Sequence, residues 1–178
     1  MVSKTKKLKI GNGMDSNTVL GPLTTKQRLD GVEKLVETTK KEGGRILCGG
    51  KKPANFNKGY YFEPTIFDGI KDNFTIMKEE PFGPIVPILT FKNFEEVIER
   101  ANNNDLGLCS YIYTNDLKKA TRASEMMETG CVAVNTAVVA VAEAPFGGIK
   151  QTGYGREGGS MAIKDYLNIK YTHFGISY

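Results

Sequence analysis

The stretch over residues 85–135 alternates between apolar and amphipathic runs, and this alternation constrains the fold more than any other feature. The apolar runs at 85–91, 108–114 and 131–135 have the length of buried strands. Two amphipathic runs separate them, and the first begins at Asn93 with Glu96 three residues on, the spacing of a capping box. Strands joined by helices at this spacing favour right-handed crossovers and a parallel sheet. The sequence therefore predicts an α/β fold.

The flanking regions add further elements. A helix is expected from Thr25 to Glu42, because its apolar residues share one face and two glycines follow it. Residues 45–48 form a short strand candidate, and a glycine-rich loop at 145–159 leads into a short helix at 160–167. The last strand, expected from Asn168 to Ile176, has no partner strand next to it in sequence. A strand of this kind is predicted to be exposed and to pair with another chain or with another part of a larger protein.

Composition excludes several classes of protein. The chain has 178 residues, of which 40% are apolar, so it is long enough for one domain with a proper core. No apolar run approaches the length of a membrane span and the start does not read as a signal peptide, so we expect a cytoplasmic protein without membrane contact. The net charge is +4, but the lysines are scattered among acids, which does not indicate a nucleic-acid partner.

Cysteine and histidine give little support for nucleophilic or metal chemistry. The three cysteines, Cys48, Cys109 and Cys131, are widely spaced and fit neither a disulfide framework nor a zinc site. Cys109 and Cys131 lie within predicted apolar strands, without a neighbouring base, and are interpreted as buried structural residues. His173 is the single histidine and is interpreted as an ordinary strand residue. No catalytic residue and no metal site are predicted.

Residues 153–158 match the pattern G-x-G-x-x-G, which in dinucleotide-binding proteins cradles a pyrophosphate. That role requires a preceding strand and an acidic residue about twenty positions later. Here a loop precedes the glycines, and no acidic residue follows Asp165. The segment is therefore interpreted as a cluster of turns.

The segment 79–84 (EEPFGP) carries two acids and an aromatic between prolines, just before an apolar strand. Charges at this position contribute nothing to the core, and the prolines restrict the loop. A carboxylate can accept hydrogen bonds from both hydroxyls of a sugar diol, so the chemistry favours a binding role for one of the glutamates. The alternative is a solvated surface loop.

A set of motifs in fixed order resembles the C-terminal portion of the aldehyde dehydrogenase superfamily. The motifs are GPL at 21–23, PT at 64–65, EEPFGP at 79–84, GL at 107–108, GCVAVN at 130–135, PFGG at 145–148 and GYGRE at 153–157. The resemblance covers essentially the whole chain, and Met1 is expected to fall inside a family helix. It implies residues 1–167 as part of the catalytic domain and residues 168–178 as an oligomerisation strand and tail.

The resemblance also implies roles for particular residues. Glu80 matches the glutamate that holds the nicotinamide ribose, and Phe82 the aromatic residue beside the nicotinamide. Phe146 and the loop at 136–141, including Ala140, match part of the substrate tunnel. The family's nucleophilic cysteine, general-base glutamate, oxyanion asparagine and NAD- or NADP-binding domain would all lie upstream. Cofactor binding by this part alone is therefore not expected.

Within the family, residues 144–153 and 165–171 look most similar to succinate-semialdehyde dehydrogenases. Those enzymes usually place a serine in the loop where this chain has Ala140, which leaves the substrate open. One hypothesis makes the chain half of a split enzyme, joined by a complementary N-terminal polypeptide or forming a homo-oligomer through Asn168 to Ile176. Another makes it a non-catalytic relic or interaction module. A third, complete catalysis by this chain, has the least support.

Overall fold

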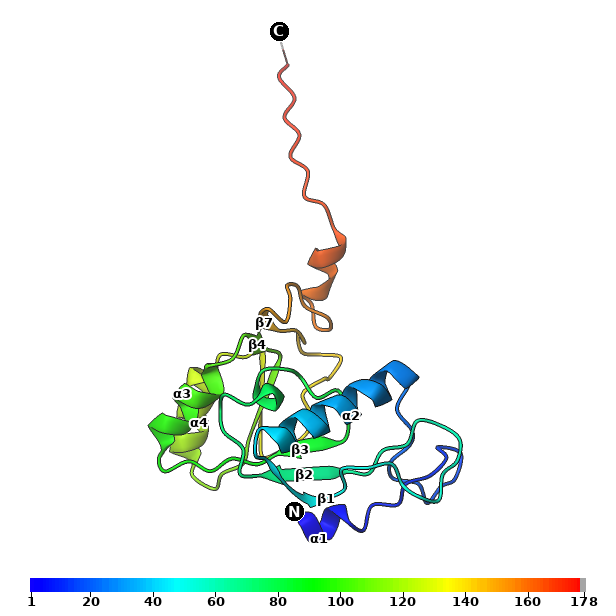
Figure 1. Ribbon diagram of the computed structural model, residues 1–178. Helices are drawn as coiled ribbons and strands as arrows, with labels where there is room; N and C mark the ends of the chain where they lie inside the picture. The colour runs from blue at the N-terminus through cyan, green and yellow to red at the C-terminus, as the bar shows by residue number, and fades with distance from the viewer. Residues whose placement is uncertain (177–178) are drawn as a thin grey trace. The chain divides into compact units, whose positions relative to one another are not determined.

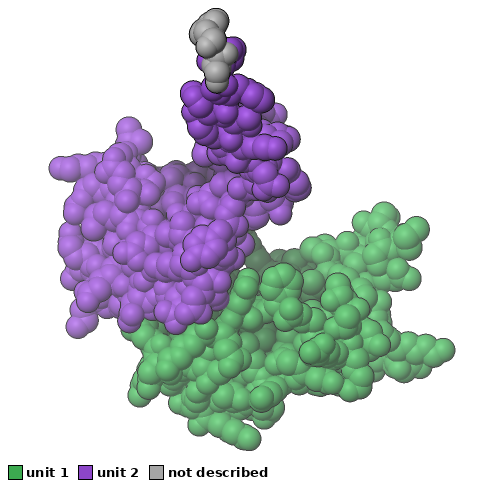
Figure 2. Space-filling model, turned by 90° about the horizontal axis from the view of Figure 1, so that it is seen from above, with its two compact units in different colours: residues 1–91 green, residues 92–178 purple. Residues whose placement is uncertain are grey.

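The computed structural model describes residues 1–176 and divides into two compact units, one from Met1 to Phe91 and the other from Lys92 onward (Figure 2). The first unit contains one three-stranded sheet and its main helix. Its elements are α1 (Val2–Thr5), α2 (Lys26–Lys41), β1 (Arg45–Cys48), β2 (Thr65–Asp68), the 3₁₀ turn η1 (Thr75–Met77) and β3 (Ile85–Pro87). The strand order is β1-β2-β3, with β1 antiparallel and β3 parallel to β2.

Helix α2 lies along this sheet and supplies most of the first unit's core (Figure 1). The Thr25 side chain accepts a hydrogen bond from the Arg28 amide at 3.2 Å and begins the helix, as the sequence predicts. One face is buried against the sheet and the segment leading to it. The buried residues are Leu29, Val32, Leu35 and Val36 from the helix, with Phe62, Phe67 and Ile85 from the sheet side.

The second unit combines a parallel strand pair with two helices. Its elements are α3 (Phe94–Asn102), β4 (Leu106–Gly107), β5 (Cys109–Ile112), α4 (Leu117–Met126), β6 (Cys131–Val134), β7 (Ile149–Lys150) and the 3₁₀ helix η2 (Ala162–Tyr166). Strands β5 and β6 are parallel and in register, whereas β4 and β7 form a small antiparallel pair. The α/β class is therefore confirmed.

The predicted pairing of the three central strands was wrong. Only β5 and β6 pair with each other, because β3 joins β2 in the first unit, with Thr65 opposite Ile85. Ile85 is buried in that unit's core, and the Thr65 amide donates to the Pro84 carbonyl at 2.8 Å. The β3 strand thus pairs with a segment twenty residues earlier in the chain rather than with the strands that follow it.

The capping box at α3 differs in one bond from the predicted form. The Asn93 side chain accepts from the Glu96 amide at 2.9 Å, as expected. The Glu96 carboxylate, however, accepts from the Lys92 amide at 2.8 Å rather than from that of Asn93. The carboxylate therefore holds the backbone of Lys92, the residue that precedes the cap.

The segment from Asn168 to Ile176 carries no strand in the structure, and every one of these residues is exposed (Figure 1). The predicted strand therefore has no pairing partner within the described part of this chain. Ser177 and Tyr178, which complete the predicted tail, lie outside the described residues. None of the helices in residues 1–176 combines the length and apolarity that crossing a membrane requires.

Candidate functional site

The loop at residues 79–84 is held in place against α2. At the start of η1, which leads into the loop, the Glu42 carboxylate accepts from the Thr75 amide and, at 2.6 Å, from the Thr75 hydroxyl. Near its end, Gly83 approaches the helix so closely that a Cβ there would lie 2.5 Å from a Val32 methyl group. A side chain at position 83 would therefore push the loop away from α2. These two contacts fix where the loop presents its glutamates.

A cleft of about 370 Å³ opens between α2 and this loop. It is lined by Thr25, Gln27, Arg28, Gly31, Val32 and Leu35 from the helix side, and by Glu79, Glu80, Pro81 and Phe82 from the loop. Phe82 is 63% exposed, and the Arg28 guanidinium carbon lies 4.9 Å from the centre of its ring. This cation–π contact orients an aromatic face at the edge of the cleft.

Glu80 lines the cleft with an exposed carboxylate. Within residues 1–176 no donor hydrogen-bonds to this carboxylate and no cation pairs with it. Both of its oxygens are therefore available to accept hydrogen bonds, which suits a ribose diol. The cleft thus combines an open carboxylate with an exposed aromatic face, and a contact of either residue with a nicotinamide nucleotide stays a prediction. The structure thus places Glu80 and Phe82 in the same cleft. Sequence reasoning missed Arg28, which lies in the first turn of α2 and belongs to no motif.

Phe146 belongs to the second unit, where a folded glycine-rich loop surrounds it. Its backbone forms a two-way bridge with Glu157, with N–O distances of 2.6 and 2.7 Å. The Arg156 guanidinium donates to the carbonyl groups of Gly148 and Gly155 at 2.9 and 2.6 Å. Phe146 is half-buried and lines a cleft of about 510 Å³ within this loop.

Ala140 does not line the cleft that contains Phe146. It lies on an exposed stretch after β6, where Val138 and Val141 are also exposed, by 62% and 46%. The structure therefore places the two predicted substrate residues in one unit but not in one cleft. Their contact with a substrate stays a prediction.

The glycine cluster at 153–158 is a series of turns, as the sequence predicts. Gly153, Gly155 and Gly158 all adopt positive φ angles, of 117°, 85° and 70°. Two residues separate Gly153 from the end of the short strand β7, which lies where the sequence predicts a loop, and the next element after the glycines is the 3₁₀ helix η2 rather than an α-helix. Asn135 also has a structural task, because its side-chain amide exchanges two hydrogen bonds with the backbone of Thr114.

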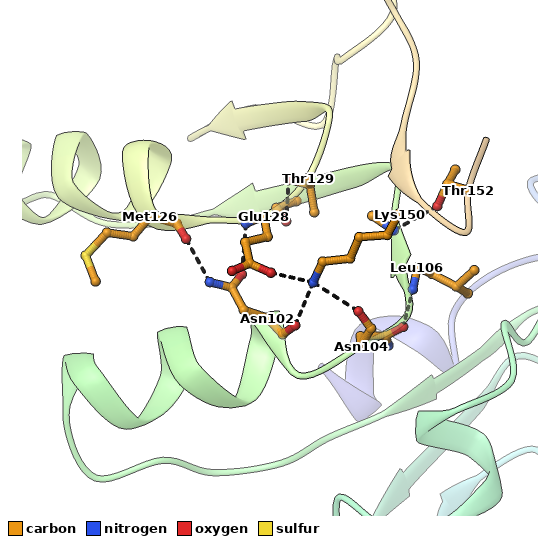
Figure 3. Close-up of polar contacts among 10 residues, drawn as sticks. Asn102, Asn104, Leu106, Met126, Glu128, Thr129, Lys150 and Thr152 are labelled. Atoms are coloured by element: carbon orange, nitrogen blue, oxygen red, sulfur yellow. Dashed lines mark hydrogen bonds and ion pairs between the residues drawn. The ribbon is translucent and has the colours of Figure 1, made fainter. Parts of the chain in front are cut away.

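Lys150 lies at the centre of a polar network in the second unit, which no sequence pattern predicts (Figure 3). Its Nζ donates to the carbonyl oxygens of Asn102 and Asn104 at 2.7 and 3.0 Å, and to the Glu128 carboxylate at 2.6 Å. The lysine thereby caps the end of α3 and joins it to the turn before β6. The nearest signal in sequence is its place after the PFGG motif, which does not identify its partners.

Cys109 and Cys131 are half-buried rather than fully buried, which corrects the prediction for both. They occupy opposite positions on β5 and β6, and the Cys131 thiol also points to the Gly147 carbonyl at 3.7 Å. Burial, followed by the charge and hydrogen bonding of Cys131, raises the pKa of the Cys109 thiol. Across residues 1–176, no group of three or more histidine, cysteine or acidic side chains is arranged to hold a metal ion.

Comparison with known proteins places this geometry in a family. The model of the aldehyde dehydrogenase family matches residues 1–172. The chain belongs to the aldehyde dehydrogenase family. It is 42% identical over 177 residues to the chloroplastic betaine aldehyde dehydrogenase of Atriplex hortensis, covering 99% of this chain and 35% of that one. It is 41% identical over 170 residues to the NADP⁺ succinate-semialdehyde dehydrogenase of Escherichia coli K12, covering 96% and 35% of the two chains.

Solved structures of this family have the same fold. The aldehyde dehydrogenase of Bacillus cereus, in its NAD⁺ complex, matches with a TM-score of 0.91 and 41% identity over 95% of this chain. The succinate-semialdehyde dehydrogenase of Burkholderia pseudomallei matches with a TM-score of 0.90 and 38% identity over 96% of this chain. The aligned part is 34% and 35% of those chains, so this chain spans about a third of its relatives' length.

Proposed function

We propose that this chain forms the C-terminal part of the active site of an NAD(P)-dependent aldehyde dehydrogenase, which oxidises an aldehyde to a carboxylic acid. One observation supports this most directly: the unpaired Glu80 carboxylate in the cleft beside α2, within a chain that matches the family over residues 1–172. The NAD⁺ complex of the Bacillus cereus relative supports the choice of cofactor class.

Three residues of this chain serve the reaction in this proposal. The Glu80 carboxylate accepts hydrogen bonds from the ribose hydroxyls next to the nicotinamide, and Phe82 packs beside the ring. Phe146 forms part of the wall around the aldehyde. The bound cofactor supplies the acceptor for the hydride of the aldehyde. The nucleophile and the rest of the cofactor site come from the portion that the relatives have in addition, so the 178 residues alone do not turn over.

The proposed substrate is succinate semialdehyde or a similarly small aldehyde. The resemblance of the C-terminal motifs to succinate-semialdehyde dehydrogenases supports this choice. Ala140, flanked by Val139 and Val141, offers no side-chain donor to a second carboxylate. A substrate carboxylate that finds no hydrogen-bond donor in the site weakens binding by on the order of 1–3 kcal/mol. An uncharged small aldehyde is therefore the competing substrate. Relatives of similar identity include enzymes named for betaine aldehyde and for retinaldehyde, so overall identity does not select among them.

A fusion protein tests the proposed function. The N-terminal two-thirds of the Bacillus cereus relative would be joined to this chain at the start of the matched region, and NAD(P)H formation would be followed with a panel of aldehydes. We expect aldehyde-dependent reduction of NAD⁺ or NADP⁺ by the fusion and none by this chain alone. A folded fusion that binds no nucleotide would contradict the ribose role of Glu80, and turnover by the chain alone would contradict its dependence on a partner portion.

A second candidate function is that of an interaction module. It is favoured by the exposed apolar side chains from Asn168 to Ile176, among them Ile169, Tyr171 and Phe174 at 102%, 84% and 82% exposure. This segment would pair with a complementary N-terminal polypeptide or a second copy of the chain. Light scattering measures the molar mass of the chain alone and in a mixture with an intact relative. A dimer of the chain alone indicates a second copy as the partner, a complex in the mixture indicates the portion that the relative has in addition, and a monomer in both contradicts the interaction module.

A further inference from the structure

Cys109 and Cys131 come from segments that are separated by a whole helix in sequence, yet the parallel pairing of β5 and β6 sets them directly opposite each other. Opposed residues on neighbouring strands point to the same face of the sheet, with strands about 4.8 Å apart. A disulfide requires Cα atoms about 4.4–6.8 Å apart. The backbone therefore already holds the two cysteines at the spacing of a disulfide.

Both residues are half-buried rather than buried, so a small oxidant can approach this side of the strand pair from solvent. Cys48, the third cysteine of the chain, is buried in the other unit and its thiol points to the Pro64 carbonyl at 3.9 Å. Cys48 thus differs from the other two cysteines in both accessibility and pairing. Neither Cys109 nor Cys131 has a part in the function proposed above.

We propose that Cys109 and Cys131 form a reversible oxidation site, in which a disulfide compound such as glutathione disulfide converts the two thiols into a disulfide between β5 and β6. One thiolate attacks a sulfur of glutathione disulfide, and the S–S bond breaks to release one glutathione thiolate, which takes up a proton. The second thiolate then attacks the protein sulfur of the mixed disulfide and releases the other glutathione. The protein loses two electrons and two protons, and glutathione disulfide gains both.

The environment of the pair determines how fast this exchange begins. Burial is the main reason that the pKa of Cys109 is raised, and charge on Cys131 raises it further. A raised pKa leaves less of Cys109 as thiolate at neutral pH, so a first attack by Cys109 is slow. Because the second thiol is already next to the mixed disulfide, the closing step is much faster than the first. We expect little mixed disulfide to accumulate.

Redox titration of the purified chain tests the site. The chain would be equilibrated with buffers of defined ratios of glutathione to glutathione disulfide, with and without urea, and the remaining thiols blocked by alkylation. Trypsin separates Cys48, Cys109 and Cys131 into peptides 46–51, 101–118 and 123–150. The expected product joins the second and third peptides and leaves Cys48 alkylated. Dithiothreitol should restore all thiols.

The measurement in urea is the control for proximity in sequence, because an unfolded chain also forms the disulfide that closes its shortest loop most readily. A larger equilibrium constant in the folded chain than in urea therefore measures how far the fold positions the two thiols. Positioned thiols should raise the equilibrium constant for the linked product at least about tenfold over the unfolded chain. C48S should behave as the unsubstituted chain, whereas C109S and C131S should each yield only mixed disulfide. An equal constant in buffer and urea, a link through Cys48, or accumulation of the mixed disulfide in the unsubstituted chain would overturn the proposal.

Discussion

Glu79 and Glu80 are neighbours of identical chemistry, and both line the cleft beside α2. Their substitutions therefore separate a specific contact with a ribose from a general effect of negative charge at this loop. Charge-assisted hydrogen bonds contribute about 1.5–3 kcal/mol each, more than the neutral bonds that an amide would retain.

Glu80→Gln in the fusion enzyme should raise the KM for NAD(P)⁺ by roughly ten- to a hundredfold, in line with the loss of one such bond. Initial rates over a range of cofactor concentrations measure this change. Glu79→Gln is the matched control and should leave the KM near its original value. Equal effects of the two substitutions would show that the loop contributes charge and not a defined ribose contact.

Lys150→Met should destabilise the second unit by about 1–3 kcal/mol, because two carbonyl oxygens and one carboxylate lose their shared donor. Urea unfolding followed by circular dichroism measures the loss. Lys118→Met removes a charge from an exposed position of α4 that forms no ion pair with any of residues 1–176, and it serves as the control. A free energy of unfolding that falls equally in both variants would refute a structural role for the network.

At the scale of single elements, α3 shows how a short local pattern sets a boundary. The Asn93 side chain and the Glu96 carboxylate together satisfy two backbone amides at its start. The helix has only nine residues, so its ends contribute a large part of its stability.

Asn93→Ala should lower the free energy of unfolding by about 1 kcal/mol, since the Glu96 amide loses its acceptor. Asn93→Asp should retain most of the stability, as aspartate caps equally well. Asn57→Ala changes an exposed loop position in the same chemical way and should have no measurable effect. A loss at Asn93 that aspartate does not restore would point to a cause other than capping.

At the scale of the whole molecule, carboxylates that accept hydrogen bonds make the fold sensitive to acid. The Arg45 guanidinium lowers the pKa of Asp68, and the Lys119 amide lowers that of Asp116, both below the ordinary value of 3.8. The Lys92 amide, followed by Arg100, lowers the pKa of Glu96 below 4.5.

Because the pKa values of these carboxyl groups are lower in the folded state, the ionised carboxylates stabilise the fold. This stabilisation is complete above the ordinary carboxyl pKa range and is lost as the pH falls through the lowered pKa values. We therefore expect urea midpoints that are level near neutrality and decrease in the acid range. Glu96→Gln should be less stable near neutrality and should show a shallower acid decrease. An unchanged slope in this variant would exclude Glu96 from the acid response.

Removing the chain from Asn168 onward should leave the unfolding free energy unchanged, because residues 168–176 are exposed and outside the core. The same truncation should abolish any dimer or higher species of the chain. Sedimentation velocity of both forms measures this. Association that persists without the segment would place the interaction surface elsewhere.

The sequence by itself determined the elements whose signals are local. The helix α2 and the cap of α3 follow from side-chain periodicity and from polar groups within three or four residues, and these interactions act at short range in any context. The chemistry of the EEPFGP loop predicts a binding role for one of its glutamates, which stays a prediction, whereas the ordered motifs identified the family.

Only the tertiary structure decided which distant segments meet. Periodicity shows that β3 is a strand, but its pairing with β2 depends on the path of the chain and on the core that buries Ile85. The acceptors of Lys150 are mostly backbone carbonyls, which every residue possesses and no sequence pattern marks. The pairing of Cys109 with Cys131 likewise depends on the register of β5 and β6, a long-range property that neither cysteine carries in its neighbourhood.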